Sequence, residues 1–201
     1  MRSKIITINN YNDSNILLKK INLYKSILYY DTLFVVKNNI NDEMINYMIN
    51  ALNIKNRKKR IQYIYDKSCE LIDNKTKNIN ICGFKSGKCY VQRKLKNGKC
   101  NGCCRKCLYQ TKKGCSTKNL SCKLFNCTEV TSRYEVIKYK DLKLLKILSL
   151  KNQIIIKSDY FSKREDVLKD LYSYSFIYSG VRIICRLIRN LFILLKWIKK
   201  Y

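Results

Sequence analysis

The chain has 201 residues, no proline and no histidine, and its 42 lysines and arginines against 14 acidic residues give a formal net charge of +28. The missing histidine excludes Ser-His-Asp and Cys-His catalysis, histidine-rich zinc hydrolase sites and mixed Cys/His zinc fingers. A hydrophobic content of 46% is sufficient for a packed interior and excludes general disorder. The positive charge points to nucleic acid or an anionic membrane surface as a partner, although a proline-free sequence rich in lysine, asparagine, isoleucine and tyrosine is also what an AT-rich genome encodes.

The N-terminal region, residues 1–78, is predicted to be mainly helical. Its first ten residues lack the apolar run and cleavage site of a secretory signal, so we expect a cytoplasmic, reducing location. Apolar periodicity predicts helices over 13–30, capped by Asp13 or Ser14, and over 42–52 and 56–72, with a strand-like segment over 29–36. The third helix begins with a basic run, residues 57–60, that either binds a phosphate backbone or is a solvated helix end. We expect its buried stripe to contain Ile61, Ile64, Tyr65, Ser68, Cys69 and Ile72.

A cysteine-rich module is predicted over residues 79–128. It holds nine of the eleven cysteines, namely Cys82, Cys89, Cys100, Cys103, Cys104, Cys107, Cys115, Cys122 and Cys127. In a reducing compartment such a density indicates a metal site more than disulfides or unliganded thiols. Two C-x-x-C pairs lie back to back over residues 100–107, and each lets two sulfurs converge on one ion across a tight turn. The spacing therefore predicts more than one sulfur-only site, for zinc or for an iron–sulfur cluster.

The remainder of the module is predicted to position two of the cysteines and to surround the site with positive charge. Residues 79–84 and 89–93 suggest two strands of a hairpin joined across 85–88, which would bring Cys82 and Cys89 within reach of each other. Between Cys82 and Cys127 the sequence has twelve lysines and arginines and no acid. Such a positive field stabilises thiolates, the form that binds metal, and it would also attract an anion.

The order of cysteines in the module resembles a known family. The segments that carry the likeness are Cys100-x-x-Cys103-Cys104-Arg105, then Cys107-Leu108, Gly114-Cys115-Ser116, and Cys122-Lys-Leu-Phe125-Asn-Cys127. They are similar to the zinc- or iron-chelating cysteine-cluster domain family, and most of all to small uncharacterised cysteine-rich proteins of AT-rich anaerobic bacteria. The resemblance covers about a quarter of the chain and implies metal binding. One branch of the family is associated with methylation of flagellin lysines.

The chain departs from the family pattern at two places. Asn97 stands where the family has a further cysteine, and either Cys89 or Cys82 would have to supply that sulfur. Lys118 and Asn119 lie where the family has Arg-Pro. The number of ligands and the identity of the metal therefore remain open.

The C-terminal region, residues 129–201, is again predicted to be helical. The leucines at 142, 145 and 148 suggest a helix, and the isoleucines at 154–156 suggest either a helix or a buried strand. Residues 162–165 form a capping-box sequence, Ser-Lys-Arg-Glu, which predicts a helix through Val167, Leu168 and Leu171.

The final segment, residues 176–200, is strongly apolar but contains six cations and no acid. Arg182, Arg186 and Arg189 share one helical face and argue against a transmembrane span. Two interpretations remain: the helix packs its apolar side on the core, or it lies in an anionic membrane surface with Phe192 and Trp197 inserted. We expect Cys185, within this segment, to be a buried structural thiol.

We therefore predict an α+β fold, mostly α, in which helices flank a small irregular, metal-crosslinked cysteine-rich module with a β-hairpin, the three regions forming one compact unit. The leading functional hypothesis is a cytoplasmic metal-binding protein with a structural or metal-handling role. One alternative is a nucleic-acid-binding protein with a zinc-stabilised basic module, in which Tyr90, Tyr109 and Phe125 stack on bases. Another is an iron–sulfur protein-lysine methyltransferase-like enzyme. No glycine-rich cofactor loop, paired carboxylates or general base stands out, so we predict no catalytic residue.

Overall fold

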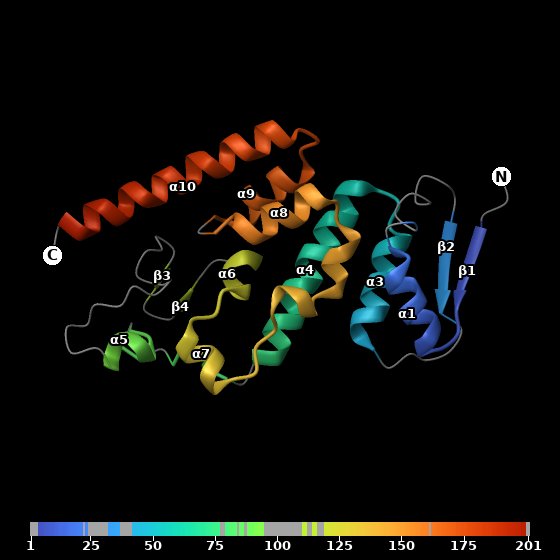
Figure 1. Cartoon of the computed structure of the whole chain (residues 1–201), viewed down its shortest axis with the longest axis horizontal. Coiled ribbons are helices and arrows are strands. Elements are labelled where there is room, and N and C mark those ends of the chain that lie inside the picture. The colour runs from blue at the N-terminus through green and yellow to red at the C-terminus, as the bar shows by residue number, and fades with distance from the viewer. Residues whose placement is uncertain are drawn as a thin grey trace. The chain divides into compact units, whose positions relative to one another are not determined.

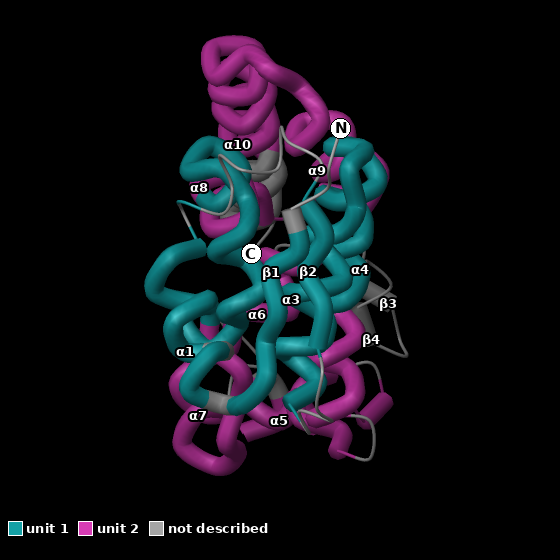
Figure 2. Tube along the Cα trace, turned by 90° about the vertical axis from the view of Figure 1, so that its right-hand side faces the viewer, with its two compact units in different colours: residues 1–68, 139–153 teal, residues 69–138, 154–201 magenta. Residues whose placement is uncertain are grey.

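The computed structural model describes residues 4–21, 23, 32–36, 42–76, 79–83, 85, 86, 88–94, 110, 111, 114, 115, 119–160 and 162–199. Within them the chain is mostly helical, with two small two-stranded sheets, which confirms the α+β class with helix dominant (Figure 1). The chain divides into two compact units, each assembled from two separate stretches of sequence (Figure 2). Unit 1 comprises residues 1–68 and 139–153, and unit 2 comprises residues 69–138 and 154–201.

Unit 1 begins with a parallel pair of strands. β1 (Lys4–Ile8) pairs with β2 (Thr32–Val36), with Ile6 opposite Phe34. The side chain of Asn53, at the end of α3 (Glu43–Asn53), binds the backbone of β2. Its amide oxygen accepts from the Phe34 N–H and its amide nitrogen donates to the Phe34 carbonyl, both at 2.8 Å. β2 confirms the strand expected over 29–36 for residues 32–36, while residues 29–31 lie outside the described part of the chain. β1 was not predicted.

The helices of unit 1 follow the sequence closely. α1 (Tyr11–Lys19) confirms the first expected helix as far as residue 19, but its N-cap is Asn10, whose side chain accepts from the Asp13 N–H at 3.0 Å. α3 and α4 (Arg57–Thr76) confirm the second and third helices, and every side chain of the stripe expected on α4 is buried. The leucines at 142, 145 and 148 are buried too, but the chain there forms two 3-10 turns, η2 (Tyr139–Asp141) and η3 (Lys143–Ile147), instead of an α-helix.

Unit 2 contains the cysteine-rich module and the C-terminal helices. Its elements are the end of α4, then α5 (Tyr90–Lys94), β3 (Gln110–Thr111), β4 (Gly114–Cys115), α6 (Leu120–Leu124), α7 (Thr128–Arg133), the end of α8 (Leu150–Ser158), α9 (Arg164–Tyr172) and α10 (Phe176–Lys199). The isoleucines at 154–156 are helical, which decides between the two structures that the sequence allowed. Helix α9 is present as expected, but the prediction that residues 162–165 form its capping box is wrong. Its N-cap is Lys163, and the Ser162 hydroxyl instead donates to Asp159 at 2.5 Å.

Candidate metal site

The segment that carries Cys82 and Cys89 is a closed loop. The Tyr90 N–H donates to the Cys82 carbonyl at 2.9 Å, and Lys85 and Lys88 exchange backbone bonds of 3.0 and 3.1 Å. Gly83 bends the chain with a left-handed φ of 57°, and a side chain there would bring its Cβ within 3.1 Å of the Tyr90 Cβ. Cys82 and Cys89 therefore lie at neighbouring ends of one loop.

The two strands predicted on either side of this loop are wrong. Residues 79–83 form a turn, and residues 90–94 form helix α5. The Arg93 guanidinium donates to the Lys88 carbonyl at 3.0 Å and also to the Gly83 carbonyl, so a side chain closes the loop where a strand ladder was expected. Among the described residues, the antiparallel hairpin of the module lies later, where Gln110 in β3 pairs with Cys115 in β4.

Cys122 is fixed in the first turn of α6 by Asn119. The Asn119 side chain accepts from the Cys122 N–H at 2.9 Å and donates to the carbonyls of Asp159 at 2.8 Å and Ser162 at 3.0 Å. Asn119 is fully buried, so these bonds are shielded from water. Ser121 adds a further bond to the Ile156 carbonyl. The backbone that positions the Cys122 thiol is thus anchored to α8 and to the α8–α9 connection.

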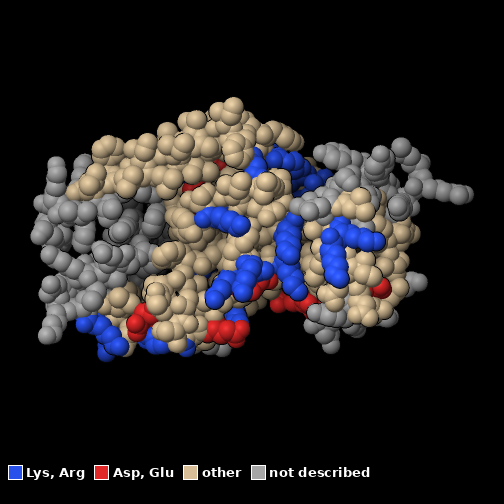
Figure 3. Space-filling model, viewed as in Figure 1, with Lys and Arg blue, Asp and Glu red and all other residues tan. Residues whose placement is uncertain are grey.

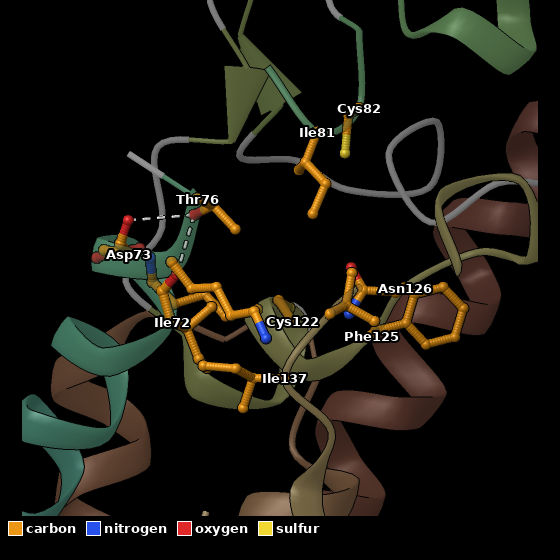
Figure 4. A pocket seen from close by; sticks show the side chains of 12 residues that line it. Ile72, Asp73, Thr76, Ile81, Cys82, Cys122, Phe125, Asn126 and Ile137 are labelled. Carbon is orange, nitrogen blue, oxygen red and sulfur yellow. Dashed lines mark hydrogen bonds and ion pairs between the residues drawn. The ribbon is translucent and has the colours of Figure 1, made fainter. Parts of the chain in front are cut away.

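Cys82 and Cys122 line the same pocket, which has a volume of about 220 Å³ (Figure 4). They reach it from separate parts of the sequence: Cys82 from the loop that follows α4, and Cys122 from α6. The apolar part of the lining consists of Ile72, Ile81, Phe125, Val136 and Ile137. That both cysteines line one pocket could not be read from cysteine spacing.

Charged side chains complete the pocket. Lys123 forms an ion pair with Asp73, and Lys75 forms one with Glu135 at 3.1 Å. Near Cys122, burial raises the pKa of Tyr160, and the negative charge of the Cys122 thiolate adds to that rise. The Tyr160 ring contacts Phe125 edge to face, with centroids 6.0 Å apart. Each of the two lysines is thus paired with an acid beside a pocket that two cysteines line.

The nine predicted ligands divide into three groups. Cys82, Cys89, Cys122 and Cys127 are described and half-buried, whereas for Cys115 the backbone alone is described. Cys100, Cys103, Cys104 and Cys107 lie outside the described residues. Across the described ranges, no three His, Cys, Asp or Glu side chains are grouped closely enough to hold an ion. The structure therefore brings two predicted ligands to one pocket and a third to the neighbouring end of the same loop.

The remaining two cysteines have contrasting environments. Cys69 is buried within the α4 stripe, as expected for a small apolar side chain. Cys185, on α10, is exposed, so its prediction as a buried thiol is wrong. The physical reason is that the face of α10 on which Cys185 lies is turned outward.

The aromatic side chains proposed to stack on bases have protein contacts where they are described. The Arg133 guanidinium lies 3.7 Å from the centroid of the Tyr90 ring and the Lys94 ammonium lies 4.4 Å from it. Tyr109 lies outside the described residues. Tyr90 thus already makes cation–π contacts of the kind that stabilise a loop, and base stacking stays a prediction.

No protein family, curated protein or solved structure was found to match the chain. The likeness to zinc- or iron-chelating cysteine clusters therefore remains one of cysteine order and spacing.

Proposed function

We propose that the chain is a metal-binding protein whose cysteine-rich module, residues 79–128, holds zinc or an iron–sulfur cluster through thiolates. The observation that supports this most directly is the pocket lined by Cys82 and Cys122, whose positions in the sequence are far apart. Cys89 lies at the other end of the Cys82 loop, where the Tyr90 N–H bonds the Cys82 carbonyl, so it is a further candidate sulfur donor. Thiolates are the ligands that zinc and iron–sulfur clusters use when histidine is absent.

The residues present fit such a metal in two physical respects. Much of the pocket wall is apolar, and the twelve cations without an acid between Cys82 and Cys127 in the sequence would favour thiolates over thiols. In addition, the Cys122 backbone is held by buried hydrogen bonds, as a rigid ligand requires. When bound, the metal would join the Cys82 loop to α6 and act as a crosslink that an irregular segment otherwise lacks. The remaining sulfurs would come from Cys100, Cys103, Cys104, Cys107, Cys115 and Cys127.

A cytoplasmic location forms part of this proposal because metal-binding thiols must stay reduced. None of the described helices combines the length and hydropathy needed to cross a lipid bilayer. We further propose that the protein contacts a membrane peripherally through α10. The features of α10 carry this part of the proposal.

Metal analysis of anaerobically purified protein tests the proposal. We expect stoichiometric zinc, or iron together with broad visible absorption, because zinc is colourless. The variant Cys82→Ser/Cys122→Ser should contain less metal, while Cys185→Ser, which alters an exposed cysteine outside the module, should match the wild type. Chelation should lower the Tm of the wild type, because metal binding and folding are coupled. Wild-type protein that contains neither zinc nor iron would refute the proposal, and an unchanged metal content in the double variant would remove this pocket from the site.

A further inference from the structure

Helix α10 is attached to the rest of unit 2 by its polar side. Ser179, which is buried, donates to the Asp170 carbonyl at 3.3 Å, and one turn later Arg182 pairs with the Asp170 carboxylate at 3.0 Å. Arg186 then bridges two acids, Asp159 at 2.8 Å and Asp170. The two carboxylates are 1% and 0% exposed, so these pairs are shielded from solvent. These ion pairs therefore hold α10 by the side that bears Ser179, Arg182 and Arg186.

The apolar side of α10 consequently faces outward. Six side chains spaced alternately four and three residues apart form one stripe along the helix, and each is at least 46% exposed: Ile177, Val181, Ile184, Ile188, Leu191 and Leu195. Phe176, Tyr178, Leu187 and Phe192 widen this outward stripe on both sides and are exposed as well. A helix on the surface of a globular protein normally shows the opposite arrangement. Packing of the apolar side on the core, which the sequence allowed, is thus wrong for the described part of α10.

The charge of this region indicates what covers the outward stripe. Residues 171–201 contain six cations and no acid, and the whole chain carries +28. Asp159 and Asp170 neutralise two of those cations on the inner side, whereas Arg189 is exposed. Two copies of the chain meeting along α10 would therefore bring like charges together, which opposes association. An anionic surface would instead be attracted.

The shape and composition of the helix fit a bilayer surface. α10 has 24 residues and spans about 36 Å at a rise of 1.5 Å per residue. Figure 1 shows it as one long, unbroken helix, and the exposed apolar side chains run along it. In the view of Figure 3, the described side chains along α10 are mostly uncharged. Exposed aromatic side chains, Tyr174, Phe176 and Tyr178, stand at its beginning, and such rings favour the headgroup level of membranes. An interfacial helix combines these features: a wide apolar side, cations and no acid.

We propose that α10 docks flat on an anionic lipid bilayer, with its outward stripe inserted at the level of the headgroups. The ion pairs of Asp159 and Asp170 already hold the outward stripe exposed before the membrane is bound, so α10 needs no reorientation to bind. Membrane docking goes beyond metal binding and does not depend on it, because none of the residues involved is a proposed ligand.

Flotation of the full-length protein with vesicles tests this proposal. The wild type should float with vesicles of phosphatidylcholine and phosphatidylglycerol and stay behind with phosphatidylcholine alone. We expect the variant Ile184→Ser/Leu191→Ser to bind the anionic vesicles at least tenfold more weakly, because it loses apolar contact without a change in charge. Leu150→Ser, at a leucine that is 74% exposed on α8, should bind like the wild type.

Three outcomes would overturn membrane docking by α10. The first is wild-type protein that floats with neither vesicle. The second is a double-serine variant that binds anionic vesicles as well as the wild type, which would assign the binding to another basic surface. The third is a stable dimer in light scattering that the double-serine variant dissociates, which would assign the outward stripe to a second copy of the chain. Circular dichroism of each variant checks that the helices are retained.

Discussion

The two compact units bury different kinds of side chain. In unit 1 the described core is formed by hydrocarbon from β1, β2, α1, α3, α4 and η3, and the buried polar side chains are Thr32, Ser68 and Asn152. In unit 2 the described core has fewer apolar members, and it buries Asn119, Ser121, Asp159, Ser162, Asp170 and Ser179. Unit 1 thus follows the usual rule of apolar burial, whereas unit 2 relies on specific hydrogen bonds and ion pairs, together with the metal that we propose. The difference implies that the two units should respond to different substitutions.

The largest expected effect is that of Arg186→Met in unit 2. This substitution removes the cation that joins Asp159 to Asp170 and leaves two buried carboxylates facing each other. We expect a loss of about 3–5 kcal/mol in the free energy of unfolding, since breaking a buried ion pair leaves an uncompensated charge. Urea unfolding measures the loss, and hydrogen exchange should show faster exchange in α9 and α10. Arg189→Met, on the same helix but exposed, should change stability by less than about 0.5 kcal/mol. Equal effects of the two variants would show that the buried ion pairs do not stabilise unit 2 as proposed.

A substitution that removes only apolar atoms should lower the free energy of unfolding most in unit 1. Leu52 is fully buried on α3, and Leu52→Ala should cost about 2–5 kcal/mol because it leaves a cavity among close-packed side chains. Leu33→Ala, at a side chain that is 45% exposed, should cost much less. The loss for Leu52→Ala should not vary with pH, because no charged group is altered. Urea unfolding of both variants at several pH values checks this, and a small loss for Leu52→Ala would contradict a hydrocarbon-based core.

The smallest expected effect is a pH dependence of the free energy of unfolding, which arises from Asp159 in unit 2. Burial raises the pKa of Asp159 above 3.8, and it outweighs the opposing hydrogen bond from Ser162 and the positive charge of Arg186. The folded chain therefore holds this proton more tightly than the unfolded chain does. The resulting contribution to stability is present at low pH and is lost as the pH rises from about 3.8 through the raised value.

Asp159→Asn should accordingly gain stability relative to the wild type as the pH is raised through this range. Urea midpoints of the two proteins across the range measure the change. Asp141→Asn, at an exposed aspartate, controls for the loss of one negative charge. A relative stability of Asp159→Asn that fell with rising pH would show that the ion pair with Arg186 outweighs burial.

Elements with strong local signals could be predicted from the sequence. α3 is an example, because Asp42 caps it by accepting from the Ile45 N–H at 3.1 Å and its apolar residues recur at helical spacing. β1 could not be predicted in the same way, because its partner β2 lies beyond α1 in the sequence and the pairing is not local. The Ser162 capping box failed for a related reason. Its hydroxyl finds a stronger acceptor in the buried Asp159 carboxylate than in the backbone of α9.

The candidate site could be predicted in composition but not in arrangement. The absence of histidine and the density of cysteine identify sulfur as the donor, but spacing alone does not place Cys82 beside the Cys122 pocket. Asn119 was missed, although an asparagine three residues before Cys122 carries a typical N-cap signal. The outward side of α10 could not be predicted either. Periodicity defines the width of an apolar face, but the acids that turn this face outward belong to α9 and to the segment before it.

The three bonds of Asn119 have a mechanical consequence. A single buried side chain fastens the N–H of Cys122 to the carbonyls of Asp159 and Ser162, and the Asp159 carboxylate in turn holds α10 through Arg186. The first turn of α6 cannot shift without straining or breaking these bonds. Asn119 therefore links the position of a thiol that lines the pocket to the position of α10, the helix that presents the outward stripe.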